Sequence, residues 1–232
     1  GQATIFTYWK DTSYRGQAEF AGENPVDGAI ITYSLGSGSG EAHLRIARDN
    51  GEVVRDYLVP SQEGMHRVNW DLRHPVAGVS GTEPWAATGQ DGLQRNIRNR
   101  GHFVSPGTYT VTLEARGTTS STTVAVRGDP EMPLTQAQYE DREAFLSGIQ
   151  ALQAEFAGVL GVGQELGRGG RQQMAGMSEA QQALAQHLRN VSGVYQALNG
   201  GGVRQGSLYP PTTAQRDRVD AARAALREFQ RQ

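Results

Sequence analysis

The sequence predicts an all-β half followed by an all-α half, and two observations lead to this prediction. Between residues 29 and 127, apolar residues alternate with polar ones, which is the period of strands with one buried face. After "RGDPEMP" the apolar residues recur every three or four positions, which is the period of amphipathic helices. Roughly seven short strands with frequent turns predict an immunoglobulin/fibronectin-III-like antiparallel β-sandwich. The second half predicts a C-terminal three-helix bundle.

The β half is expected to contain strands separated by short turns. In "EAHLRIAR", Leu44 and Ile46 are expected to point inward, with His43 and Arg45 pointing outward. Trp70 is expected to anchor the core. The segments that predict strands are "AIITYSL", "EAHLRIAR", "VVRDYLV", "GMHRVNW", "GTYTVTLEARG" and "STTVAVRG".

The α half is expected to contain three helices, at about 135–160, 178–199 and 212–230. Each begins with Thr or Ser followed three residues later by Gln, which is the pattern of a capping box. Each helix also carries one apolar stripe. These stripes are most simply buried against one another.

The domain boundaries follow from these periods. Residues 1–23 are assigned to an N-terminal arm, 24–130 to the sandwich with a long loop at 75–104, and 131–232 to the helical domain. Connections longer than about 15 residues are uncommon in compact domains and are often functional. The arm and the loop are rich in aromatic residues and arginines, the residue types that dominate interface energetics. The candidate partner contacts are Phe6, Tyr8, Trp9, Tyr14, Trp85, Arg95, Arg98 and Arg100.

Composition excludes several classes of function. The chain has no cysteine, so thiol catalysis, Cys-based zinc sites and disulfides are excluded. Lys10 is the single lysine, which argues against Schiff-base chemistry and a phosphate-loop lysine. The net charge of -2 gives no basic surface for nucleic acid, and no apolar run is long enough for a transmembrane segment.

The stretch "GMHRVNWDLRHP" offers a catalytic alternative, with Asp71 as a base beside His66 or His74. Along a strand, however, Asp71 points away from Trp70 and His66. We therefore favour a strand that ends in a polar corner, where Asp71 pairs with Arg73. No group of side chains predicts a catalytic site, a metal site or a cofactor site, so the chain is not expected to be an enzyme.

Four stretches resemble a known group of bacterial proteins: "NPVDGAIITYSL", "LRIARDNGEVVRDYLVP", "GMHRVNWDLRHP" and "SPGTYTVTLEARG". Together they are similar to the C-terminal region of large proteins that carry sortilin-like propellers of BNR (Asp-box) repeats. The same strands are similar to the Ig-like domain of flagellar hook-capping proteins. The likeness covers roughly residues 18–160. The propeller has no counterpart here, so the resemblance carries over no catalytic residue, and it implies an extracytoplasmic bacterial module.

These observations together predict a non-catalytic structural or interaction subunit, located in the periplasm, at the cell surface or in the medium. Its expected partner is a protein or a multi-subunit complex, with the outer face of a membrane as one candidate location. The alternative is a carbohydrate-binding accessory module of a secreted glycoside hydrolase-like protein, in which Trp85 or Tyr14 would stack on sugar rings.

Overall fold

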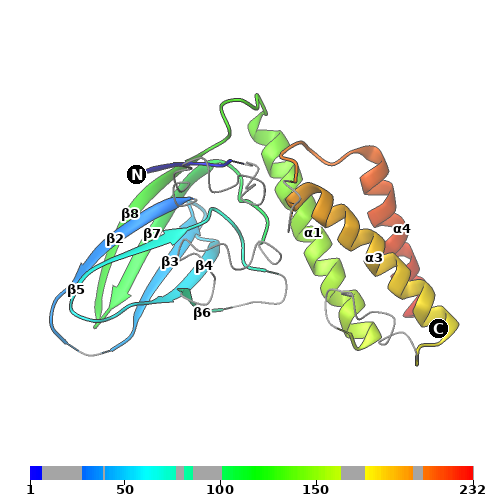
Figure 1. The fold of residues 1–232 in the computed structure, drawn as a ribbon, viewed down its shortest axis with the longest axis horizontal. Coiled ribbons are helices and arrows are strands. Elements are labelled where there is room, and N and C mark those ends of the chain that lie inside the picture. The colour runs from blue at the N-terminus through cyan, green and yellow to red at the C-terminus, as the bar shows by residue number, and fades with distance from the viewer. Residues whose placement is uncertain are drawn as a thin grey trace, which may run out of the picture. The chain divides into compact units, whose positions relative to one another are not determined.

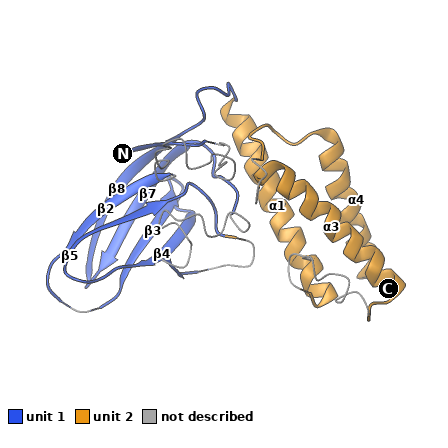
Figure 2. Ribbon diagram, viewed as in Figure 1, with its two compact units in different colours: residues 1–75, 79–134 blue, residues 76–78, 135–232 orange. Residues whose placement is uncertain are grey.

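The structure is a computed structural model that describes residues 1–6, 28–38, 40–76, 81–85, 101–162, 176–200 and 206–231. The chain divides into two compact units (Figure 2). Unit 1 comprises Gly1–Pro75 and Val79–Leu134, and unit 2 comprises Val76–Gly78 and Thr135–Gln232. Unit 1 contains the strands and unit 2 contains the helices (Figure 1).

Unit 1 is built from two sheets. The six-stranded sheet has the order β1-β8-β7-β3-β4-β6, and the two-stranded sheet pairs β2 with β5. The strands are β1 (Gln2–Thr4), β2 (Ala29–Leu35), β3 (Ala42–Arg48), β4 (Val53–Val59), β5 (Gly64–Trp70), β6 (Glu83–Pro84), β7 (Gly107–Ala115) and β8 (Thr118–Arg127). The long strands coincide with the segments in which polar and apolar residues alternate.

The predicted fold class, an all-β immunoglobulin/fibronectin-III-like antiparallel sandwich before an all-α bundle, is wrong. The chain has a mixed α/β fold, in which a six-stranded mixed sheet and a two-stranded sheet are followed by three packed helices. Two pairs of the large sheet are parallel: β1 with β8, and β4 with β6. Strands of three and two residues are too short to show a hydrophobic period. Both therefore lie within segments that the sequence predicts to be the arm and the long loop.

The core of unit 1 lies between the two sheets. Trp70 of β5 is fully buried, and its ring meets the ring of Tyr109 of β7 edge-on, with the ring centroids 5.0 Å apart. The indole nitrogen of Trp70 donates a hydrogen bond to the carbonyl of Arg73, which satisfies its one polar atom. Trp70 is therefore the core anchor that the sequence predicted.

One end of unit 1 is fastened by a side chain from the β7–β8 turn. Arg116 has a φ of 53° and Gly117 a φ of 75°, as a tight hairpin turn requires. The Arg116 guanidinium donates to the carbonyl of Gly36, in the β2–β3 connection, and to the carbonyl of Ser61, in the β4–β5 connection. A single arginine thus holds three connections together.

Unit 2 consists of α1 (Gln136–Leu160), α3 (Glu179–Asn199) and α4 (Thr213–Phe229). Their apolar stripes share one core, which confirms the predicted packing of three helices. All three helices begin with the expected capping box, at Thr135, Ser178 and Thr212. No helix in the described part of the chain has the length and apolar character needed to cross a membrane.

A buried arginine of α1 links the end of α3 to the segment before α4. Arg142 of α1 donates from its side chain to the carbonyls of Leu198 and Ser207, at 3.1 Å and 2.9 Å. These carbonyls lie at the end of α3 and just before α4. Arg142 therefore gives the Ser207 carbonyl a partner, and it adds a second donor to the Leu198 carbonyl, which also accepts from the Ser207 N–H.

Candidate interaction surface on the six-stranded sheet

The outer face of the six-stranded sheet carries the largest group of interlinked charged side chains that the structure describes. Along β3, Ala42, Leu44 and Ile46 are buried, while His43 and Arg45 point to the opposite side. This alternation is the geometric consequence of the extended backbone. The outward orientation predicted for His43 and Arg45 is confirmed.

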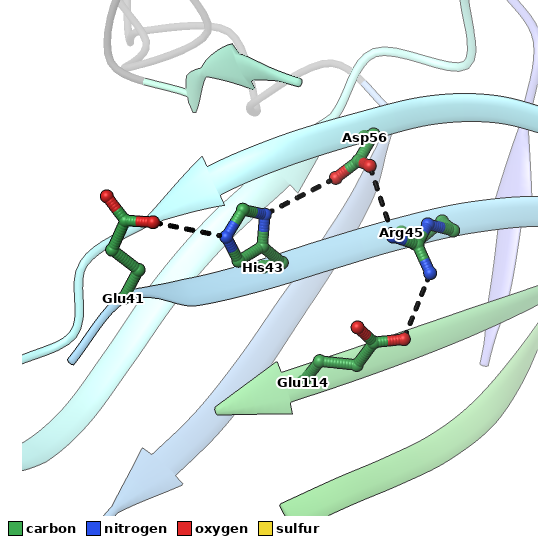
Figure 3. Close-up of polar contacts among 5 residues, drawn as sticks. All are labelled: Glu41, His43, Arg45, Asp56 and Glu114. Carbon is green, nitrogen blue, oxygen red and sulfur yellow. Dashed lines mark hydrogen bonds and ion pairs between the residues drawn. The ribbon is translucent and has the colours of Figure 1, made fainter. Parts of the chain in front are cut away.

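The strand register places side chains from three strands next to one another on this face. Arg45 of β3 lies opposite Asp56 of β4, and His43 lies opposite Glu114 of β7. Cross-strand neighbours on one face have Cβ atoms about 5 Å apart, close enough for their side chains to pair. We call the set Glu41, His43, Arg45, Asp56 and Glu114 the outer-face network (Figure 3).

The network is a chain of ion pairs centred on Asp56 and Arg45 (Figure 3). Arg45 Nη2 lies 3.3 Å from Asp56 Oδ2, and Arg45 Nη1 lies 2.9 Å from Glu114 Oε1. His43 Nδ1 lies 3.8 Å from Asp56 Oδ1, and His43 Nε2 lies 3.6 Å from Glu41 Oε2. The two histidine contacts become ion pairs only when the imidazole carries a proton.

The carboxylate side chains of this network differ in their exposure to solvent. The Asp56 side chain is 15% exposed, whereas the Glu114 side chain is 44% exposed and the Glu41 side chain 74% exposed. Exposed ion pairs contribute about 0.2–1 kcal/mol to folding. Their larger effect is to hold long side chains in one arrangement. A surface of this kind can present ordered charges to a partner at a reduced entropic cost.

Hydroxyl groups extend the same face beyond the charges. Thr112 of β7 and Ser121 of β8 are cross-strand neighbours, and their hydroxyl oxygens lie 3.1 Å apart. Thr110 and Thr123 form the next pair on this side. The face therefore offers charged groups over β3, β4 and β7, and donors and acceptors of hydrogen bonds over β7 and β8.

A second polar group lies at the edge where β6 meets β4. Arg55 Nη2 lies 2.6 Å from Glu83 Oε1, and both side chains are largely buried, at 5% and 16% exposure. Arg55 Nη1 also donates to the carbonyl of His74 at 2.8 Å, and the guanidinium lies 4.8 Å from the centre of the Tyr57 ring. Arg55 thus joins β4, β6 and the segment after β5.

Three effects act on the pKa of the Glu83 carboxyl. Burial raises its pKa, the positive charge of Arg55 lowers it, and the negative charge of Asp71 raises it again. The net shift is upward, because burial outweighs the attraction to Arg55. This group is therefore a structural ion pair for which desolvation exceeds the Coulombic gain.

The stretch "GMHRVNWDLRHP" forms a packed corner. Asp71 Oδ1 accepts a hydrogen bond from the backbone N–H of Arg73, and the Arg73 side chain donates to the carbonyl of Gly101. The Arg73 guanidinium also lies over the Phe103 ring, 3.5 Å from its centre. Asp71 and Arg73 are thus associated through the Arg73 backbone, and the Arg73 guanidinium also contacts Gly101 and Phe103.

The two histidines of the catalytic alternative have different neighbours. His66 contacts the Gln62 carbonyl through Nε2, at 2.8 Å, and its ring lies 5.2 Å from the Tyr33 ring. His74 stacks on His102, with the ring centroids 4.6 Å apart. These contacts fit structural roles and not a shared catalytic site with Asp71.

Two of the candidate partner contacts lie within the described residues. Phe6 follows β1 and is 50% exposed. Trp85 is partly buried, and its indole nitrogen donates to the carbonyl of Asn69 at 2.9 Å, at the edge of β5. Tyr8, Trp9, Tyr14, Arg95, Arg98 and Arg100 lie outside the described residues.

The sequence pattern alone does not identify the outer-face network as a site. Strand alternation placed His43 and Arg45 on the outside, but the partners of these side chains depend on register. Asp56 and Glu114 are 11 and 69 residues from Arg45 along the chain. The useful signal was the occurrence of two basic residues at outward positions of one strand.

Comparisons with known protein families, with curated proteins and with solved structures found no match for this chain.

Proposed function

We propose that this chain is a non-catalytic interaction module that binds a partner protein, or a subunit of a larger complex, through the outer face of its six-stranded sheet. The observation that supports this proposal is the outer-face network. Its Arg45 is held between Asp56 and Glu114, so the charges are ordered before a partner arrives. Preordered side chains lose less conformational entropy on binding.

The chemistry of the surface suits recognition better than catalysis. The network joins carboxylates to an arginine and a histidine, and hydroxyl groups flank it on β7 and β8. Charged groups of both signs lie within one strand spacing of each other, which favours a partner with a matching pattern of charges. Binding to such a surface is expected to weaken as salt is added.

We further propose an extracytoplasmic location for the module. This part of the proposal depends on the resemblance to C-terminal regions of bacterial propeller proteins. The absence of cysteine is compatible with an oxidising compartment and with a reducing one alike.

The experiment places a photo-crosslinking amino acid at Thr112, inside the proposed surface, and in a second protein at Arg223 of α4. Crosslinking is carried out in extracts of bacterial cell envelopes, and products are identified by mass spectrometry. We expect one defined protein to be captured from position 112 and not from position 223. Arg45→Glu should abolish that product, because it reverses the central charge, whereas Arg223→Glu should leave it unchanged.

Two results would contradict the proposal. One is capture of the same set of proteins from both positions. The other is a position-112 product that survives Arg45→Glu in a variant with an unchanged circular dichroism spectrum. A glycan array probed with the intact chain tests the carbohydrate alternative, and specific glycan binding that Arg45→Glu leaves intact would also count against the proposed surface.

A further inference from the structure

The turn between β3 and β4 contains Asn50-Gly51, one of the two Asn–Gly sequences of the chain; the other is Asn199-Gly200. The Gly51 N–H donates to the carbonyl of Arg48 at 3.0 Å, which closes a four-residue turn. Gly51 has a φ of +85°, a conformation that glycine adopts without strain. The shape of the turn therefore favours glycine directly after Asn50.

The side-chain amide of Asn50 is held within the same turn. Its Oδ1 accepts a hydrogen bond from the main-chain N–H of Glu52 at 2.9 Å, two residues further along the chain. This N–H polarises the amide carbonyl and stabilises negative charge that develops on Oδ1. The amide carbon Cγ is therefore activated toward attack by a nucleophile. The main-chain nitrogen of Gly51 is such a nucleophile, and its attack on Cγ closes a five-membered ring.

Solvent reaches the groups that take part in this ring closure. Asn50, Gly51 and Glu52 are all exposed. A Cβ added at Gly51 would have no atom within 4 Å, so the space around this residue is open. Because glycine has no side chain to shield its nitrogen, water and dissolved bases can approach the Gly51 N–H.

The second Asn–Gly sequence has the same two residues in a different setting. Asn199 is the last residue of α3 and is only 7% exposed. The Gly200 N–H donates to the carbonyl of Gln196 at 2.9 Å, in the last turn of the helix. Gly206 packs so closely that a Cβ added there would lie 2.6 Å from the Gly200 nitrogen. Ring closure at Asn199 therefore requires this end of the helix to open first.

We propose that Asn50 is a site of spontaneous covalent modification, at which the Gly51 nitrogen closes a succinimide ring and ammonia is released. The Gly51 nitrogen forms a bond to Cγ of Asn50, and the bond between Cγ and Nδ2 breaks. The proton of the Gly51 N–H is transferred through solvent to the departing nitrogen, which leaves as ammonia. The step is neither an oxidation nor a reduction.

Water then opens the ring in one of two ways. Cleavage between nitrogen and Cγ gives aspartate at position 50 with an ordinary main chain. Cleavage between nitrogen and the main-chain carbonyl carbon gives isoaspartate, which adds one methylene to the main chain. Either product places a third carboxylate in the turn, beside those of Asp49 and Glu52. The modification goes beyond the proposed function, because it needs no partner and uses no residue of the outer-face network.

The test follows both asparagines in the full chain during incubation at neutral pH. Trypsin releases Asn50 in the peptide "DNGEVVR" and Asn199 in the peptide "NVSGVYQALNGGGVR". Chromatography with mass spectrometry then separates the unmodified, aspartate and isoaspartate forms of each peptide. In the folded chain we expect Asn50 to react about tenfold or more faster than Asn199, because only Asn199 requires the helix to open. In concentrated urea the two rates should become nearly equal, because both asparagines precede glycine.

Asn50→Gln is the matched control. Glutamine keeps the amide but has one more methylene, so attack by the Gly51 nitrogen would have to close a six-membered ring, which is much slower. Isoelectric focusing of the wild type should show an acidic form that grows with time. In Asn50→Gln, the growth of this form should be lost over the same period.

Three results would overturn the proposal. The first is an Asn50 that stays unmodified in the folded chain but reacts in urea, because the hydrogen bond from Gly51 to Arg48 would then protect the turn. The second is an equal rate at Asn50 and Asn199 in the folded chain. The third is an acidic form that grows as fast in Asn50→Gln as in the wild type.

Discussion

Replacement of Arg55 by methionine tests whether the Arg55–Glu83 pair holds the β6 edge in place. Arg55 is 5% exposed, lies 2.6 Å from Glu83 and also binds the carbonyl of His74. Methionine fills much of the same volume along Tyr57 but carries no charge. The variant leaves Glu83 in a buried position near the negative Asp71, with no cation to balance it.

The expected cost is about 3–5 kcal/mol at neutral pH, the usual range when one partner of a buried ion pair is removed. With a shift of about 2–4 °C per kcal/mol for chains of this size, the midpoint of thermal unfolding should fall by about 10 °C. The cost should shrink on acidification, because protonation of Glu83 removes the unbalanced charge.

Arg55→Met is combined with a second substitution, Glu83→Gln, in a double-mutant cycle. On its own it should change stability by less than about 1 kcal/mol at neutral pH, because burial disfavours the charged carboxylate and the amide oxygen can still accept from Arg55. Added to Arg55→Met, it should restore most of the lost stability, because position 83 then carries no buried charge that lacks its Arg55 partner. The coupling between the two substitutions should therefore exceed about 1 kcal/mol.

Tryptophan fluorescence during urea unfolding provides the assay. All three tryptophans, Trp9, Trp70 and Trp85, belong to unit 1, so their emission reports on that unit. The reasoning is refuted if Arg55→Met costs less than about 1 kcal/mol. It is equally refuted if the double variant loses as much stability as Arg55→Met alone.

Three further predictions concern the backbone, a helix end and pH. Gly28→Ala should destabilise unit 1 by more than about 1 kcal/mol, because Gly28 has a φ of +89° and an added Cβ would lie 1.9 Å from the Trp70 carbonyl oxygen; a urea midpoint equal to that of the wild type would contradict this. Thr212→Ala should cost about 1 kcal/mol through loss of the α4 cap, as followed by circular dichroism, whereas Thr213→Ala, one position inside the helix, should cost less. Glu83 has a raised pKa in the folded state, so its contribution to the free energy of unfolding should fall as pH rises from the ordinary carboxyl range through that raised pKa. The difference between wild type and Glu83→Gln should show this slope, and a flat difference would refute it.

The regular elements could be predicted because their signals are local. The alternation in "AIITYSL" and "VVRDYLV" marks β2 and β4, and the Thr–Gln or Ser–Gln capping pairs mark the starts of the three helices. Burial of Trp70 followed from its place on the apolar side of β5. Each of these signals needs only a few neighbouring residues.

The arrangement of the strands could not be predicted in the same way. A period of two shows that a segment is extended, but it does not show which strand lies beside it or in which direction. The parallel pairing of β1 with β8 joins residues 123 positions apart, such as Gln2 and Ala125, and leaves no local pattern. Roughly seven short strands with frequent turns predicted an antiparallel order, which the short parallel strands β1 and β6 contradict.

The candidate site was missed for the same physical reason. Arg45 could be assigned to an outward position, but its distances to Asp56 and Glu114 depend on which strands flank β3. Six of the eight predicted contact residues lie outside the described residues, so their role stays a prediction.

The pairing of β1 with β8 also has a consequence for synthesis of the protein on the ribosome. Gln2–Thr4 are synthesised before their partners Ala125–Arg127, which follow more than a hundred residues later. Closing so long a loop carries an entropic cost that is met only when both ends are present. We therefore expect β1 to join the sheet only after β8 has been synthesised. The contacts among the helices are closer in sequence, so we expect no comparable delay in their packing.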